Sequence, residues 1–147
     1  MFTLTKKTGY GLIALTHMAG LQDGQLVSAR EVAEIYNVPT CLLMNVLKEL
    51  AAAGVLESVR GARGGYRLAV AAEEITLASL VEHLEGPVAL VDCVREGAAD
   101  DTCRSRGRCP VAAPLEQIND RLHDFLSQVT LTSLMESAGE PAEVGES

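Results

Sequence analysis

The sequence predicts a mainly α-helical fold with one small β-hairpin and a long helix towards the C-terminus. Three observations lead to this prediction. Two short helical segments are joined by the turn Asn37-Val38-Pro39, two strand-like runs flank the glycine- and arginine-rich segment 60–64, and a single apolar stripe extends from Leu115 to Val129. With 147 residues, the chain has room for one compact domain with a helical extension.

The first expected helix covers about residues 8–20 and ends at Gly20, where a polar turn follows. Both sides of this helix are apolar, so we expect it to be buried. His17 lies within it, and a packed core or interface position is a simpler interpretation of this histidine than a ligand role.

A second, shorter helix is expected from about Ala29 to Tyr36. Its start is marked by Ser28-Ala29-Arg30-Glu31, which has the spacing of a capping box. In such a box the serine hydroxyl accepts a backbone N–H, and the glutamate returns to the serine amide.

The third expected helix runs from about Thr40 to Ala53, and Gly54 ends it. Pro39 disfavours helical geometry at Val38 and suits the start of this helix. At 100° per residue, one face is apolar and the opposite face is small and polar; the first carries Leu43, Val46, Leu47 and Leu50, and the second carries Cys41, Asn45 and Lys48. Two short helices joined by a tight turn fit the DNA major groove, although an ordinary helical hairpin has the same pattern.

The next segment favours DNA over that ordinary hairpin. Val55–Val59 and Gly65–Val70 are expected to be strands around the basic tip Arg60-Gly61-Ala62-Arg63-Gly64. Glycines allow a close approach to a phosphate chain, and an arginine can enter the narrow minor groove. A helix-turn-helix followed by a basic hairpin is a winged helix-turn-helix, and its expected partner is double-stranded DNA.

The distribution of charge agrees with this interpretation. Residues 1–68 carry seven Lys and Arg against five Asp and Glu, whereas residues 69–147 carry five against fifteen, so the net charge of −8 conceals a mildly basic N-terminal half. The basic groups expected on the DNA side are Lys6, Lys7, Lys48, Arg60, Arg63 and Arg67. Only five residues are aromatic and none is Trp, which argues against base stacking on single strands.

Three cysteines follow another expected helix, about Leu77 to Glu85, which is capped by Thr76 and ended by Gly86-Pro87. Cys93, Cys103 and Cys109 are separated by nine and five residues. Four arginines lie among them, at positions 95, 104, 106 and 108, and would lower thiol pKa values and offset thiolate charge.

Metal or redox chemistry is the expected role of these thiols. A structural zinc site normally uses close cysteine pairs and four ligands, so an iron–sulfur cluster with a fourth ligand from elsewhere fits the spacing better. Zinc binding, thiol redox chemistry without a metal, and no function remain the alternatives. Cys41 is separate from this trio, and we interpret it as a side chain of the DNA-facing helix.

The long helix is expected from Pro114 to about Thr130. Its apolar residues fall within one 100° arc, and they are Leu115, Ile118, Leu122, Phe125, Leu126 and Val129. A narrow stripe needs a partner, which is either the rest of the chain or a second copy; we favour a two-fold homodimer that places two DNA-binding units about 34 Å apart. Residues 129–134 are expected to add a short turn or helix.

These features divide the chain into four parts. We expect a winged helix-turn-helix DNA-binding domain at 1–85, a cysteine-rich cluster-binding loop at 86–112, a dimerisation helix region at 113–137 and an acidic disordered tail at 138–147. No run of 18 apolar residues and no cleavable leader pattern is present, so a soluble cytoplasmic protein is expected.

Several motifs together resemble the Rrf-two family of winged-helix transcriptional regulators, of the IscR and NsrR type. They are the segment Ser58-Val59-Arg60-Gly61-Ala62-Arg63-Gly64-Gly65-Tyr66-Arg67-Leu68, the downstream Gly86-Pro87 and the three spaced cysteines. Gly86-Pro87-Val88-Ala89-Leu90 running into Cys93 is most similar to the branch that regulates the SUF iron–sulfur assembly operon.

The resemblance implies a homodimer with a 2Fe–2S or 4Fe–4S cluster held by Cys93, Cys103 and Cys109. It implies that the state of the cluster changes the affinity for DNA. It also implies which side chains read the DNA: Thr40, Cys41, Met44 and Asn45 in the major groove and Arg60 in the minor groove. We further expect Ser28, Lys48 and Arg63 to bind DNA.

The fourth cluster ligand stays open. Gly9 and Ala112 stand where relatives offer an acidic residue and a histidine. The remaining candidates are Asp92, Glu96, Asp100, Asp101, a residue of the partner's first helix or a non-protein ligand.

The resulting hypothesis is a metal-binding, cluster-sensing repressor of iron–sulfur assembly genes or of related redox and nitric-oxide stress genes. The nearest alternative is a cluster-free regulator that senses oxidants through its thiols. A small iron–sulfur electron carrier is a third possibility and predicts no sequence-specific DNA binding. No catalytic triad, phosphate loop or carboxylate pair is present, so an enzyme is not expected.

Overall fold

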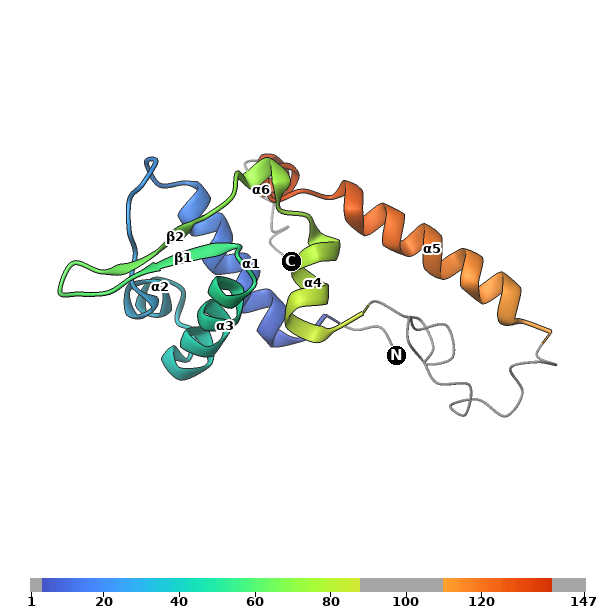
Figure 1. Cartoon of the computed structure of the whole chain (residues 1–147), viewed down its shortest axis with the longest axis horizontal. Coiled ribbons are helices and arrows are strands. Elements are labelled where there is room, and N and C mark those ends of the chain that lie inside the picture. Colours follow the sequence, from blue (N-terminus) through green and yellow to red (C-terminus); the bar gives the residue numbers. More distant parts are fainter. Residues whose placement is uncertain (1–3, 88–109, 139–147) are drawn as a thin grey trace, which may run out of the picture.

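The computed structural model describes residues 4–87 and 110–138 and contains the predicted helices and hairpin (Figure 1). The elements follow in the order α1 (Lys6–Ala19), α2 (Ala29–Tyr36), α3 (Thr40–Ala52), β1 (Leu56–Val59), β2 (Gly65–Leu68), the 3-10 turn η1 (Ala72–Glu74), α4 (Leu77–Glu85), α5 (Ala112–Gln128) and α6 (Leu131–Ala138). The predicted fold class, mainly α with a small β-hairpin wing, is confirmed.

Local capping explains why α2 and α3 lie where the sequence predicts them. The Ser28 hydroxyl accepts the Glu31 backbone N–H at 3.1 Å, and the Glu31 carboxylate accepts the Ser28 N–H at 3.2 Å, so the capping box is confirmed. Asn37 then adopts a left-handed conformation with φ of 54°, and Val38 N–H donates to the Ala33 carbonyl at 2.9 Å. This turn ends α2 and directs the chain into α3.

The two strands of the wing pair antiparallel, with Leu56 opposite Leu68 and Val59 opposite Gly65. Tyr66 also exchanges two backbone hydrogen bonds with Val27, which fastens the hairpin to the segment before α2. At Gly64 a Cβ atom would lie 2.1 Å from the Val59 carbonyl oxygen, so the tip folds back on itself only because this residue is glycine.

A single apolar core joins helices α1 to α4. The inner face of α3 predicted from periodicity is confirmed, because Leu43, Val46, Leu47 and Leu50 are all buried. They pack with Leu15 of α1 and Leu80 of α4 in the same cluster. The core therefore fixes the rotation of α3 and decides which of its side chains remain outside.

Helix α5 extends away from this core on the side opposite the wing (Figure 1). It begins two residues before the predicted start at Pro114, and only its C-terminal half packs on α4. A small second cluster forms there from Ala78, Val81 and Leu126, with Leu77 and Leu122 beside it. His123 Nε2 also lies 2.9 Å from Glu82 Oε1.

After α5 the chain returns to the core. Leu131 N–H donates to the Ile75 carbonyl at 2.8 Å, and Leu131 is buried in the main cluster. The short turn or helix expected here is α6, of eight residues. None of the helices in the described ranges is long and apolar enough to cross a membrane. The three clustered cysteines and the predicted acidic tail beyond Ala138 lie outside the described residues.

Candidate nucleic-acid interface

The outer face of α3 carries the side chains that the sequence assigns to the major groove. Thr40, Cys41, Met44, Asn45 and Lys48 are all exposed. They lie on the side of α3 that faces away from the buried Leu43, Leu47 and Leu50. This face therefore presents hydroxyl, thiol, thioether, amide and ammonium groups on one rigid helix. Such a mixture of donors, acceptors and small apolar groups is what base edges require.

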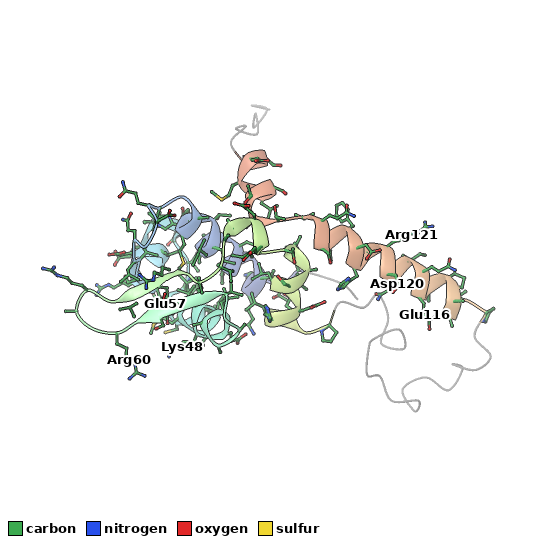
Figure 2. The ribbon with its side chains drawn as sticks, turned by 45° about the horizontal axis from the view of Figure 1, so that its top comes forward. Lys48, Glu57, Arg60, Glu116, Asp120 and Arg121 are labelled. Carbon is green, nitrogen blue, oxygen red and sulfur yellow. The ribbon has the colours of Figure 1, made fainter. Side chains whose placement is uncertain are left out.

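The wing adds two exposed guanidinium groups at its tip, Arg60 and Arg63. Figure 2 shows Arg60 and Lys48 on the same side of the molecule, one from the wing and one from α3. Neither arginine nor Lys48 forms an ion pair within residues 4–87 and 110–137. Their positive charges are therefore available to an anionic partner.

Two other basic residues expected on this side, Lys7 and Arg67, are held in ion pairs. Lys7 Nζ lies 2.7 Å from Glu49 Oε2, and Arg67 Nε donates to Glu57 Oε2 at 2.7 Å across the strand register. The hydrogen bond from Arg67, and then its positive charge, lower the pKa of the Glu57 carboxyl. The sequence did not reveal these pairs because their partners come from α3 and from the opposite strand.

Ser28 is engaged in the α2 cap as an acceptor. Its hydroxyl hydrogen is not used by that bond, so donation to a phosphate oxygen stays a prediction. His17, expected at a packed core or interface position, is half-buried, with Nδ1 at 2.9 Å from the Tyr36 hydroxyl.

A recess of about 410 Å³ lies beside the outer face of α3 and was not predicted. Its lining comes from the first turns of α1, with Lys6 and Tyr10, and from the flank of α3, with Leu42, Asn45 and Glu49. Leu42 is half exposed there. The recess shows that the N-terminus of α1 borders the candidate interface.

The first turn of α1 is held by a residue that sequence reasoning also missed. Glu85, the last residue of α4, accepts hydrogen bonds on Oε1 from the Thr5 backbone N–H at 2.8 Å, from the Thr5 hydroxyl and from the Thr8 hydroxyl at 2.6 Å. Thr5 makes no cap bond of its own, and the first turn of α1 contains no acidic residue. The lack of a local cap at the start of α1 was the one signal that its first N–H groups need an acceptor from a distant part of the chain.

The donors proposed for a metal fall outside this geometry. Cys93, Cys103 and Cys109 lie between Pro87 and Pro110, in the part of the chain that is not described, and so do Asp92, Glu96, Asp100 and Asp101. Within the described ranges no group of three His, Cys, Asp or Glu side chains could hold a metal ion. Cys41 is exposed and free on α3.

Comparison with known proteins agrees with the fold. A family model described as Rrf2, iron-dependent transcriptional regulator, matches residues 4–137. CymR, the global cysteine regulator of B. subtilis, is similar over 93% of this chain and 98% of its own, with 26% identity and a TM-score of 0.71. Staphylococcus aureus CymR is similar over 90% and 97%, with 30% identity and a TM-score of 0.67.

T. potens IscR has the same fold, with a TM-score of 0.71 over 99% of this chain and 94% of its own at 23% identity. The family match covers almost the whole chain, from the residue before the α1 cap to the residue before the end of α6. The chain therefore belongs to the Rrf2 (Rrf-two) family of transcriptional regulators.

Proposed function

We propose that this protein is a homodimeric DNA-binding repressor whose operator affinity is controlled by an iron–sulfur cluster held by Cys93, Cys103 and Cys109. One observation carries the proposal: three cysteines follow α4 in a chain that matches a family of iron-dependent regulators over residues 4–137. Three thiolates are the donor type that such clusters take, and they bind iron in preference to hard cations.

The chain's own residues support the cluster chemically. The four arginines among the cysteines favour thiolates over thiols and offset their negative charge. A bound cluster would supply a redox-active centre that also responds to iron supply and nitric oxide. The fourth ligand stays open among the candidates given above.

DNA binding is proposed for the exposed face of α3 together with the wing. Thr40, Cys41, Met44 and Asn45 would contact base edges in the major groove. Lys48 and Ser28 would contact phosphates, and Arg60 and Arg63 would approach the minor groove. The exposure of all eight positions except the half-buried Ser28 supports this assignment.

A second copy of the chain is proposed to cover the free edge of the α5 stripe. Leu122 and Leu126 face α4, whereas Ile118 is 51% and Phe125 is 62% exposed. Large apolar side chains on one edge of a helix favour an isologous contact with the same helix of a partner. Two wings and two α3 helices would then bind two operator half-sites.

The regulated genes are proposed to be those of iron–sulfur cluster assembly, of the SUF type. This rests on the similarity of Gly86-Pro87-Val88-Ala89-Leu90 to that branch of the family. Transcription profiling of a deletion strain under iron limitation tests this proposal. The transcript levels of the assembly genes are expected to rise relative to the wild-type strain.

Anaerobic purification tests the cluster. We expect iron and acid-labile sulfide in the wild-type protein and their loss in the triple variant Cys93→Ser, Cys103→Ser, Cys109→Ser. Cys41→Ser is the matched control and should keep both. A colourless wild-type protein without iron or sulfide after reconstitution would remove the cluster from the proposal.

A cluster-free thiol sensor is the second candidate, because two CymR proteins match at 26% and 30% identity and S. aureus CymR is also similar in an oxidized form, at 29%. It predicts that an oxidant such as diamide changes the operator affinity of iron-free protein. The cluster proposal predicts no change in that iron-free protein.

A further inference from the structure

We propose that Glu85 is a positioning residue that couples the segment following α4 to the DNA-facing helix α3, through the first turn of α1. The inference rests on the proposed function, because it concerns how a change in the cysteine segment would reach the DNA-binding face. Glu85 itself is assigned neither to the DNA contacts nor to the cluster.

The first link joins α4 to α1. Oε1 of Glu85 accepts three hydrogen bonds from two residues of the α1 start, Thr5 and Thr8. Thr8 is fully buried, and its hydroxyl donates to this carboxylate. One carboxylate oxygen thus replaces the local cap that α1 lacks, so α1 begins where α4 places it.

The second link joins α1 to α3 within the same turns. Lys7, adjacent to Thr8, forms the 2.7 Å ion pair with Glu49 on the flank of α3. Four residues further along α1, a Cβ on Gly11 would lie 3.0 Å from Leu84 and 3.4 Å from Val46. The C-terminal end of α4 and the middle of α3 therefore both pack closely against α1 at Gly11, with no free space between the three helices. A junction packed in this way transmits a displacement instead of absorbing it.

The position of Glu85 makes it the entry to this junction. Gly86 follows at φ of 92° and Pro87 comes next, so α4 ends at Glu85. Cys93 lies eight residues downstream of Glu85 in the sequence. Pro87 therefore joins the cysteine segment directly to the last turn of α4, where Leu84 and Glu85 lie against α1.

The charge of Glu85 agrees with this role. Partial burial raises the pKa of its carboxyl. The hydrogen bonds from Thr5 and Thr8 and the charge of Lys7 together lower the pKa by more than burial raises it, so the pKa lies below its usual value. Glu85 is therefore ionised near neutral pH, and its hydrogen bonds to Thr5 and Thr8 are charge-assisted.

Amide hydrogen exchange on the full-length protein tests the junction without reference to a cluster. Glu85→Gln should increase exchange in the first turn of α1 and also in α3 around Glu49. The matched control Glu82→Gln removes a carboxylate from the same helix that faces His123 of α5, and it should leave both regions unchanged. Exchange that rises in α1 alone, or in neither region, would overturn the proposal.

Thr8→Val keeps the buried volume but removes the hydroxyl, so it should also increase exchange in the first turn of α1 and in α3 around Glu49. It replaces Glu85→Gln in this test if that variant does not fold. Lys7→Met should raise exchange in α3 while leaving the first turn of α1 protected. This second variant separates the two links.

Operator affinity provides the functional readout. The ratio of affinities between cluster-loaded and cluster-free protein should shrink in Glu85→Gln by between about 2-fold and about 30-fold, the range expected for residues that carry coupling, and should stay at the wild-type value in Glu82→Gln. An unchanged ratio in Glu85→Gln contradicts the proposal. If the wild-type ratio is already one, the proposed function fails, and the exchange experiment still decides the role of Glu85.

Discussion

At the residue scale, the basic side chains near the candidate interface fall into two groups. Lys7 and Arg67 are held by carboxylates 2.7 Å away, whereas Lys48, Arg60 and Arg63 have no ion-pair partner in the described part of the chain. Exposed ion pairs contribute little to stability, but they remove charge from the surface that meets DNA. The paired residues are therefore poor targets for testing DNA binding, and the unpaired ones are good targets.

Arg60→Ala should weaken specific operator binding by about 1–3 kcal/mol and leave the fold unchanged, because the side chain is exposed and unpaired. Arg121→Ala on α5 removes the same group far from the wing (Figure 2) and is the control. Titration of a fluorescent duplex at several salt concentrations measures both variants. Equal affinities for the two would show that the wing tip does not contact DNA.

The pH dependence of stability should report Glu85. Its carboxyl pKa is lowered in the folded protein from a reference value of 4.5, so its contribution to stability is present above that value and is lost as the pH falls through the folded pKa. Glu85→Gln should therefore be less stable than the wild type near pH 7, and this difference should narrow as the pH falls below 4.5. Urea unfolding across this range measures it, and a difference that is constant with pH would contradict the assignment.

At the scale of elements, replacing a glycine by alanine should have opposite effects on stability in the wing and in α1. Gly64→Ala would place a Cβ 2.1 Å from the Val59 carbonyl, so we expect a distorted hairpin tip and weaker operator binding. Gly9→Ala lies inside a helix where nothing comes within 4 Å of the new methyl group, so it should stabilise the protein by about 0.5–1 kcal/mol. Thermal unfolding of both variants checks these signs, and a stabilised Gly64→Ala would show that the tip is free to relax.

The elements that the sequence predicts well are those with local signals. Ser28 and Glu31 are three residues apart, and their reciprocal bonds are made within one turn, so α2 could be placed from the sequence. The start of α1 at Lys6 could not, because its cap comes from Glu85, 77 residues from Thr8 and 80 from Thr5. The docking of α6 on the body was not predicted either, because it uses the hydrogen bond from the Leu131 N–H to the distant Ile75 carbonyl.

The candidate site was likewise predicted where the signal is local and missed where distant residues decide. The outer face of α3 was predicted because a 100° rotation per residue determines which side chains share a face once Leu43, Val46 and Leu47 are buried. The neutralisation of Lys7 and Arg67 was missed because it depends on how separate elements meet.

At the scale of the whole molecule, the structure has two separated regions: a compact body with the wing at one end and α5 extending from the other (Figure 1). Among residues 4–87 and 110–137, the apolar stripe of α5 is covered along one edge, by α4. The proposed dimer would bury the other edge, and it would make the distance between two wings depend on how α5 is joined to the body. The segment that carries the cysteines lies between α4 and α5 in the sequence.

Phe125→Glu should convert the protein to a monomer, because it places a charge in the centre of the proposed contact, where Phe125 is 62% exposed in the single chain. Gln117→Glu adds the same charge at an exposed position off the stripe and should leave the dimer intact. Sedimentation at micromolar concentration distinguishes the two. A Phe125→Glu protein that sediments as the wild type does would place the dimer contact elsewhere.

The most direct test of cluster-controlled DNA binding compares one anaerobic preparation before and after chelation of its iron. The probe is an operator duplex selected from a random pool by the wild-type protein, with a scrambled duplex as control. We expect the two forms to differ in operator affinity by at least about tenfold, since a switch requires different affinities in its two states. Equal operator affinity of the iron-loaded and iron-free protein would contradict the account.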